Sequence, residues 1–171
     1  MSELSENPAP LHITAKLLRV TLRPSIWRRA DEALRRELEL LLHELNTSSH
    51  FVLQVPPPAG GFELRLGLTG EHLIVAIMDV QGLPYASRSI PLEPLRSIIR
   101  SYLKLIARMG GSISSHASVT HFEALDMARR ATHNEASEQI QRVLDGMLEV
   151  DLETARRLFT ILCLVYDFPA R

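Results

Sequence analysis

Cysteine is nearly absent from this 171-residue sequence, and Cys163 is the single one it contains. One cysteine cannot form a disulfide within the chain, which is typical of proteins from a reducing cytoplasm. The neighbours of Cys163 in the sequence are apolar, so we expect a buried, inert thiol and not a nucleophile. The sequence therefore predicts a cytoplasmic protein without a thiol-based active site.

Long apolar runs are missing as well. The apolar stretches are much shorter than the roughly 20 residues that a membrane-spanning helix needs. Residues 1–10 include Glu3 and Glu6 and do not begin with a basic segment followed by an apolar one. They therefore predict a disordered leader and not a secretion signal. We expect no contact with a membrane.

Motifs that bind metals or nucleotides are also absent. Among the seven histidines, only His116 and His121 are a useful pair, and no HExxH spacing or second cysteine supports a metal site. The glycine pairs Gly60-Gly61 and Gly110-Gly111 are typical of turns and do not form a phosphate-binding loop. We expect no metal and no cofactor.

The charges nearly balance, with 19 basic and 20 acidic residues and a net charge of −1. The chain as a whole therefore has no attraction for nucleic acid. One local exception is a series of four basic residues without an acidic residue between them: Arg96, Arg100, Lys104 and Arg108. On a helix this series forms a stripe that could follow a phosphate backbone, or it is the solvated side of an amphipathic helix. Only Tyr102 lies among them for base stacking, which weakens the nucleic-acid interpretation.

Strand-like and helical patterns separate along the chain. Alternation predicts strands over 12–22, 50–55, 62–68, 72–80 and 86–90, with Thr69-Gly70 as a hairpin turn. Three- and four-residue apolar spacing predicts one N-terminal amphipathic helix, capped by Ser25 and reaching about Leu45. The same spacing predicts a C-terminal three-helix segment over 93–109, 120–145 and 152–166, with Gly110 ending the first of these helices and Asp151 capping the last. This order predicts an α+β fold with a small antiparallel sheet covered on one face, in a single domain over residues 11–171.

The second and third of these C-terminal helices carry the most informative polar residues. At about 100° per residue, four side chains should lie along one edge of the helix over 120–145: Asp126, Arg129, His133 and Ser137. The final helix is apolar nearly all round, so we expect it to be buried. Arg156 on that helix then needs a carboxylate, and Asp126 and Glu135 are the candidates.

Two interpretations of this cluster stay open. In the structural one, Asp126, Arg129, His133 and Arg156 form a paired polar lock between two helices. In the catalytic one, the two arginines hold an anion while His133 transfers a proton. An arginine shortly before a histidine on a helix is similar to helical ribonucleases of the HEPN class, although the spacing from Arg129 to His133 is shorter than in that class. A third possibility is a partner-binding surface.

The same two helices resemble the C-terminal signature of uncharacterised protein family 0262, a bacterial family. The resemblance rests on Asp126-Met127, Arg129-Arg130, His133-Asn134-Glu135, Ser137, Glu138, Asp151, the run from Thr154 to Thr160, and Cys163. Within this pattern Arg130, Asn134, Glu135 and Ser137 are candidate binding residues. The chain departs from the family pattern at Ala128, Ala131 and Ala136, where glycines are expected, and at Ser101, where an aspartate is expected. The resemblance implies a divergent member but no activity.

Because no recognisable catalytic constellation is present, we expect a non-enzymatic regulatory or protein-interaction domain. The excess of apolar surface on the last helix predicts self-association through the C-terminal helices. The alternative is a small enzyme, or an RNA-cleaving or RNA-binding domain, that uses Arg129, His133 and Arg156 together with the basic stripe. The sequence does not identify the protein partner.

Overall fold

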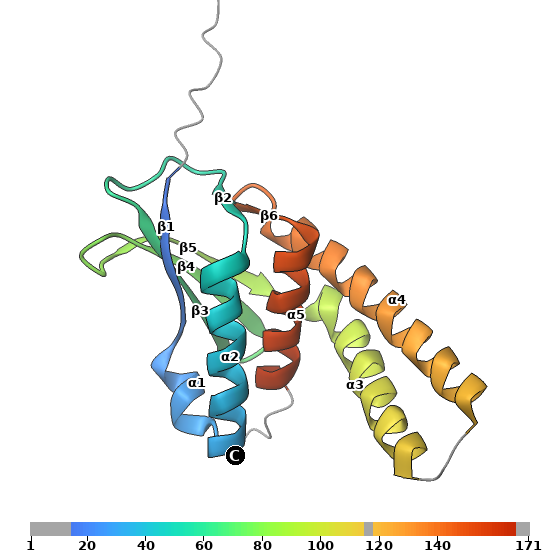
Figure 1. The fold of residues 1–171 in the computed structure, drawn as a ribbon. Helices are drawn as coiled ribbons and strands as arrows, with labels where there is room; N and C mark the ends of the chain where they lie inside the picture. The colour runs from blue at the N-terminus through green and yellow to red at the C-terminus, as the bar shows by residue number, and fades with distance from the viewer. Residues whose placement is uncertain (1–14, 115–117, 167–171) are drawn as a thin grey trace, which may run out of the picture.

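The computed structural model describes residues 15–114 and 118–166. The predicted leader at 1–10, the first residues of the strand predicted from residue 12, and His116 lie outside the described residues. The elements in chain order are β1 (Leu17–Leu22), α1 (Pro24–Arg29), α2 (Glu32–Ser48), β2 (Phe51–Leu53), β3 (Phe62–Thr69), β4 (His72–Met78), β5 (Pro84–Pro91), α3 (Glu93–Ser114), α4 (Val119–Leu144), β6 (Leu148–Val150) and α5 (Leu152–Tyr166) (Figure 1). The α+β class and the C-terminal three-helix segment are confirmed.

The main sheet has the strand order β1-β3-β4-β5. β3, β4 and β5 pair antiparallel, and the β3–β4 turn uses Gly70 with φ +56° as the sequence predicts. β1 pairs parallel with β3, so the sheet is mixed and the prediction of an antiparallel sheet was wrong at this strand. Parallel neighbours need a long crossover connection, and α1, α2 and β2 provide it.

A second, two-stranded sheet joins β2 to β6. β2 lies within the strand predicted at 50–55, whereas β6 is only three residues long and was not predicted. The start of α5 is attached to this sheet by the buried hydroxyl of Thr154, whose Oγ1 accepts a hydrogen bond from the backbone N–H of His50 at 2.9 Å. Asp151 caps α5 by accepting from the Thr154 N–H at 2.8 Å, as predicted.

Two predicted helix boundaries were wrong. The N-terminal helix is interrupted at Ala30, whose backbone is extended, and Asp31 caps a new helix by accepting from the Leu34 N–H at 2.9 Å. Ser25 lies inside the short helix α1 and does not cap it. α3 does not end at Gly110 but continues through Gly110 and Gly111, neither of which has a positive φ. A glycine within a helix lowers the stability of that helix by only about 1 kcal/mol relative to alanine, so it need not end the helix.

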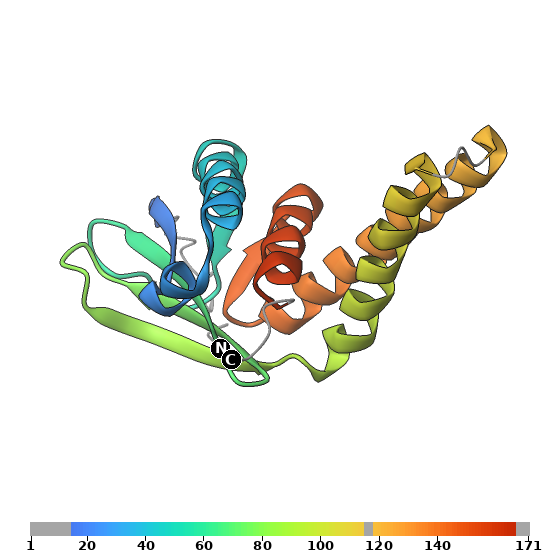
Figure 2. The same ribbon diagram turned by 90° about the horizontal axis from the view of Figure 1, so that it is seen from below.

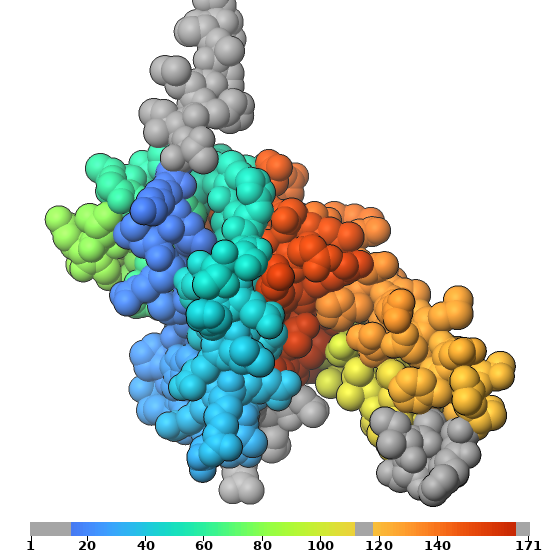
Figure 3. Space-filling model, in the orientation of Figure 1, coloured from blue at the N-terminus to red at the C-terminus, as the bar shows by residue number. Residues whose placement is uncertain are grey.

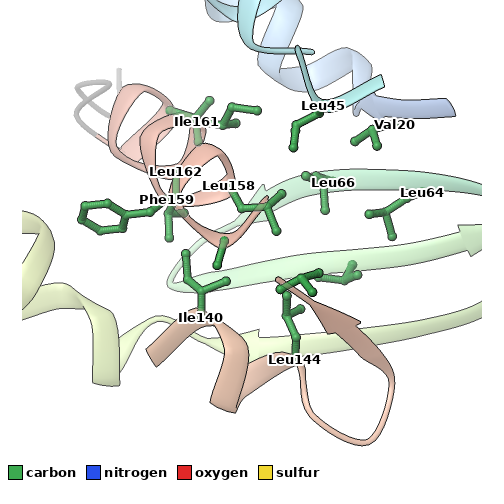
Figure 4. Packing of buried hydrophobic residues seen from close by; sticks show 14 of the residues in the cluster. Val20, Leu45, Leu64, Leu66, Ile140, Leu144, Leu158, Phe159, Ile161 and Leu162 are labelled. Atoms are coloured by element: carbon green, nitrogen blue, oxygen red, sulfur yellow. The ribbon is translucent and has the colours of Figure 1, made fainter. Parts of the chain in front are cut away.

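The core lies between one face of the main sheet and the helices α2 and α5, and the C-terminal half of α4 completes it (Figures 2 and 4). Along β3, alternate side chains enter the core, namely Phe62, Leu64 and Leu66. α5 is buried on most of its circumference, as its apolar sequence predicts, and Cys163 is buried. α2 and α5 lie on one face of the sheet (Figure 2), whereas the opposite face is bordered by α1 through Pro24, Ser25 and Arg28.

α3 and the first half of α4 extend away from this body as a helical hairpin, which we call the arm and define as residues 100–114 and 118–131 (Figures 1 and 2). Burial declines along α3, from fully buried Leu95 and Ile99 to exposed Ile106. Between 119 and 135, Leu125 is the single buried side chain of α4. Among the described residues no helix combines the length and apolarity that crossing a membrane requires.

Candidate site at the junction of three helices

Side chains from α3, α4 and α5 meet where the arm joins the body. The rings of Tyr102, His133 and Phe159 contact each other in pairs, with centroids 5.2 to 5.4 Å apart. Phe159 is fully buried, whereas Tyr102 and His133 are half-buried. We call this ring cluster, together with the arginines and polar groups around it, the junction: Tyr102, Arg129, His133, Asn134, Arg156, Phe159 and Thr160.

The hydrogen bonds of His133 determine its tautomer. Its Nε2 lies 3.3 Å from the hydroxyl oxygen of Thr160, and that hydroxyl donates its single hydrogen to the backbone carbonyl of Arg156 at 3.0 Å. Nε2 must therefore carry the proton and donate, which leaves Nδ1 as an acceptor. Burial lowers the pKa of His133, and the positive charges of Arg156 and Arg129 lower it further. The ring is accordingly neutral at pH 7.

Arg156 pairs differently from the prediction. Its Nε and Nη2 donate to Oδ1 of Asn134 at 3.2 and 2.5 Å, and its Nη1 bonds to Glu153 on its own helix. Neither Asp126 nor Glu135 is the partner, so that prediction was wrong. Asn134 faces α5, because the two helices pack directly against each other.

Asp126 instead binds the two arginines on its own helix. Its oxygens accept from Arg129 at 2.9 Å and from Arg130 at 2.8 Å. The hydrogen bond from Arg129 lowers the pKa of Asp126. The hydrogen bond to Asp126 raises the pKa of Arg129, and the neighbouring Tyr102 raises it further. Asp126 thus holds Arg129 in place beside the aromatic rings.

The remaining residues of the predicted motif lie around the junction. Ser137 is fully buried and donates to the backbone carbonyl of His133 at 2.7 Å. Ala136 is also fully buried, and its small side chain lets α4 approach α5 closely. Arg130 and Glu135 are exposed. The structure therefore brings Arg129, His133, Asn134 and Arg156 together and leaves Arg130 and Glu135 at the surface.

Only three of the four residues in the predicted basic stripe on α3 are exposed along the arm. Arg96 bonds to Glu71 and lies 3.3 Å from an oxygen of Glu93, so its charge is neutralised at the base of the arm. Arg100, Lys104 and Arg108 are exposed along the arm. Nucleic-acid binding by these three residues stays a prediction.

Tyr102, Phe159 and Thr160 were not predicted as members of the junction, and Glu153 was not predicted as a partner of Arg156. Tyr102 lies on α3, and no periodic pattern indicates which helix packs against the His133 face of α4. Glu153 precedes Arg156 by three residues, a spacing that predicts an ion pair on one helix face. Over residues 15–114 and 118–166, no group of three or more His, Cys, Asp or Glu side chains is placed to hold a metal ion.

The similarity to known proteins extends over most of the chain. The model of uncharacterised protein family UPF0262 matches residues 14–167. The chain belongs to this family. A UPF0262 protein from Azorhizobium caulinodans is 32% identical over 164 residues, which cover 95% of this chain and 98% of the relative. UPF0262 proteins from Brucella anthropi and Mesorhizobium japonicum are 35% and 32% identical over 152 residues, covering 89% of this chain and 94% and 93% of the relatives. No solved structure gives a significant match.

Proposed function

We propose that this UPF0262 protein is a protein-interaction domain that self-associates through its arm. The supporting observation is the exposure of large apolar side chains there: Ile106 is 42% exposed, Val119 74%, Phe122 36% and Met127 72%. Apolar side chains that project into water on a two-helix extension are typical of a surface that another protein covers. In the space-filling view the distal part of α4 stands clear of the body (Figure 3).

The outward face of α4 has the spacing of a helix-packing seam. Thr120, Ala124, Met127 and Ala131 follow each other at intervals of four, three and four residues, and all are exposed. This spacing places them in one line along the helix, as at the core positions of a coiled coil. Met127 would supply the contact area, and the small neighbours would let a second helix approach closely.

A second copy of the chain is the partner that the charges favour. Glu123 and Arg130 lie on the same side of the seam, seven residues apart and on either side of Met127. In an antiparallel pair of α4 helices related by a twofold axis near Met127, Glu123 of one copy would face Arg130 of the other, and the reverse contact would repeat it. Two arms joined in this way would form a four-helix arrangement.

Self-association through the C-terminal helices was predicted from the apolar surface of the last helix, but that surface is buried within the chain. Leu158, Phe159, Ile161, Leu162 and Val165 are buried against the sheet and the neighbouring helices. The junction supports the present proposal because its hydrogen bonds fix α4 against α5 just beyond the base of the arm and so set the direction in which the arm projects.

Sedimentation velocity over a wide concentration range tests the proposal. We expect the wild-type chain to shift from one to two copies with rising concentration, and Met127→Glu to remain a monomer because it places a charge in the seam. The matched control is Leu40→Glu, which changes a leucine that is 60% exposed on α2. It should dimerise like the wild type.

A charge exchange tests the antiparallel arrangement. Glu123→Arg alone should weaken the dimer, since arginines would face arginines, and adding Arg130→Glu should restore it. A wild-type chain that stays monomeric at all concentrations would contradict self-association. Equal effects of Met127→Glu and Leu40→Glu would contradict the use of the arm.

A further inference from the structure

The face of the main sheet opposite the core contains a hollow that takes no part in the proposed self-association. Its volume is about 390 Å³, and it lies between β3, β4 and β5 on one side and the β1–α1 connection and α1 on the other. Its lining includes Arg23, Arg28, Arg65, Met78, Pro84 and Ser87. This volume is within the range of small-molecule sites, about 300 to 1,000 Å³. We call it the sheet hollow.

Strand alternation explains why polar groups gather on this face. Because Phe62, Leu64 and Leu66 enter the core, Glu63, Arg65 and Gly67 lie on the other face. The side chain of Arg23 lies flat across Gly67, since a Cβ at position 67 would be only 2.3 Å from Cδ of Arg23. The absence of a side chain at Gly67 therefore lets Arg23 reach over the sheet toward the hollow.

Glu63 neutralises part of the positive charge on this face. It is buried, and its carboxylate accepts from Arg19 at 2.6 Å, from Arg65 at 2.8 Å and from the hydroxyl of Thr21 at 2.8 Å. Burial would raise the pKa of Glu63, but these hydrogen bonds outweigh it and lower the pKa. Glu63 is therefore ionised at neutral pH and holds Arg65 at the floor of the hollow.

Two further arginines keep their charge free for a ligand. Within the described part of the chain, the guanidinium groups of Arg23 and Arg28 have no carboxylate or carbonyl partner. Arg23, Arg28 and Arg65 line the hollow, and of these three only Arg65 is paired with a carboxylate, that of Glu63, which leaves a positive surplus in the lining. A concave site with convergent, unpaired guanidinium groups is suited to a carboxylate or a phosphate, which such groups bind with paired hydrogen bonds.

The opposite wall of the hollow is apolar. Ala76, Met78 and Pro84 contribute to it, and across the sheet Ala76 lies between Arg65 on β3 and Ser87 on β5. A ligand that fits both walls has an anionic end and an apolar end. Inorganic phosphate would contact only the arginines and would leave the apolar wall without a partner.

We propose that the sheet hollow binds a small organic anion. Arg23, Arg28 and Arg65 hold its phosphate or carboxylate group, and its apolar part lies against Met78 and Pro84. The inference rests on the open face of the sheet and is independent of the arm and of self-association.

Titration with phenyl phosphate, followed through backbone amide NMR shifts, tests the site. We expect the largest shifts at Arg65, Ala76 and Ser87. We also expect inorganic phosphate and phenol, which carry only one of the two features, to bind at least about 10-fold more weakly than phenyl phosphate. Arg28→Gln should weaken phenyl phosphate about 10-fold, the loss of one charge-assisted hydrogen bond.

Two matched variants make the test specific. Arg142→Gln removes an exposed arginine of α4 and should leave the affinity unchanged. Ser87→Trp keeps every charge but fills the hollow, so it should abolish binding while thermal melting shows a folded chain. The proposal is overturned if phenyl phosphate shifts no amide of the sheet face, if Arg28→Gln and Arg142→Gln have equal effects, or if inorganic phosphate binds as tightly as phenyl phosphate.

Discussion

The body and the arm of this UPF0262 protein both contain helices with many apolar side chains, but these side chains are buried in the body and partly exposed in the arm. In the body, α5 packs against α2, α4 and the sheet, and its apolar side chains are buried around most of the helix. In the arm, α3 and the first half of α4 pack mainly on each other and leave apolar side chains exposed. Apolar content alone therefore does not indicate where a helix lies, since the number of packing partners decides how much of it is buried.

The junction connects these two regions with polar contacts on either side of one aromatic cluster. His133, Asn134 and Arg156 belong to the interface of α4 and α5, while Tyr102 and Arg129 reach it from the arm. A region with few buried apolar contacts is expected to open locally at a lower free energy than the core. The body should therefore determine global stability, and the arm should respond locally.

A matched pair of phenylalanine truncations gives the largest expected difference between body and arm. Phe159 is 0% exposed in the body, and Phe122 is 36% exposed on the arm. Phe159→Ala should lower the free energy of unfolding by about 3 to 5 kcal/mol, because it leaves a cavity in a packed core. Phe122→Ala should cost less than about 1 kcal/mol. Urea unfolding measures both, and equal losses would show that the arm is packed as tightly as the body.

The elements of the fold could be predicted from the sequence wherever a local pattern determines them. The β3–β4 hairpin follows from alternation around Thr69-Gly70, and the burial of α5 follows from its apolar circumference. The parallel pairing of β1 with β3 could not be predicted, because it depends on a crossover and not on the composition of either strand. Likewise, β6 exists because β2 lies beside it, and three residues contain too little pattern to predict a strand.

In the candidate site, contacts within one helix could be predicted from the sequence, whereas contacts between helices could not. Helical geometry placed Asp126, Arg129 and His133 near one another, and the structure confirms the contact between Asp126 and Arg129. The partner of Arg156 depends on the rotation of α5 against α4, which no spacing within either helix determines. The sheet hollow was missed for a related reason. The alternation of 62–68 separates Arg65 from the core, but only the tertiary structure brings Arg23 and Arg28 beside it.

Lowering the pH should weaken the junction through His133. Burial, Arg156 and Arg129 lower the pKa of this histidine in the folded chain below its usual value near 6.5. The unfolded chain then binds the proton more readily, so stability is lost as the pH falls below about 6.5, by at most about 1.4 kcal/mol per pH unit for one proton. Urea unfolding at pH 7.5 and 5.5 measures the loss.

Two substitutions assign that loss to the junction. His133→Gln keeps a donor toward Thr160 without a titrating ring, and it should reduce the difference in stability between the two pH values. The control is His43→Gln, which removes an exposed histidine on α2 and should leave the difference unchanged. If both variants retain the full pH dependence, His133 does not supply it.

Two glycines within α3 allow the stability of the arm to be changed separately from that of the body. Gly110 and Gly111 lie within α3, have no positive φ and have open space where a Cβ would stand. Replacing each with alanine should stabilise the arm by about 0.5 to 1 kcal/mol, since alanine restricts the unfolded chain more than glycine does. Hydrogen exchange of amides on the arm side of α3 should slow accordingly, while the global urea midpoint should change little.

Gly82 provides the matched control for these alanines, because it too has open space around it but a φ of +78° in the β4–β5 turn. Gly82→Ala should destabilise the body by about 1 kcal/mol through backbone strain alone. If Gly110→Ala instead raised the global midpoint as much as it slowed exchange within α3, arm and body would unfold as one cooperative unit. A separate response of α3 would mean that its packing can change without unfolding the sheet, which is what a surface that binds a second copy requires.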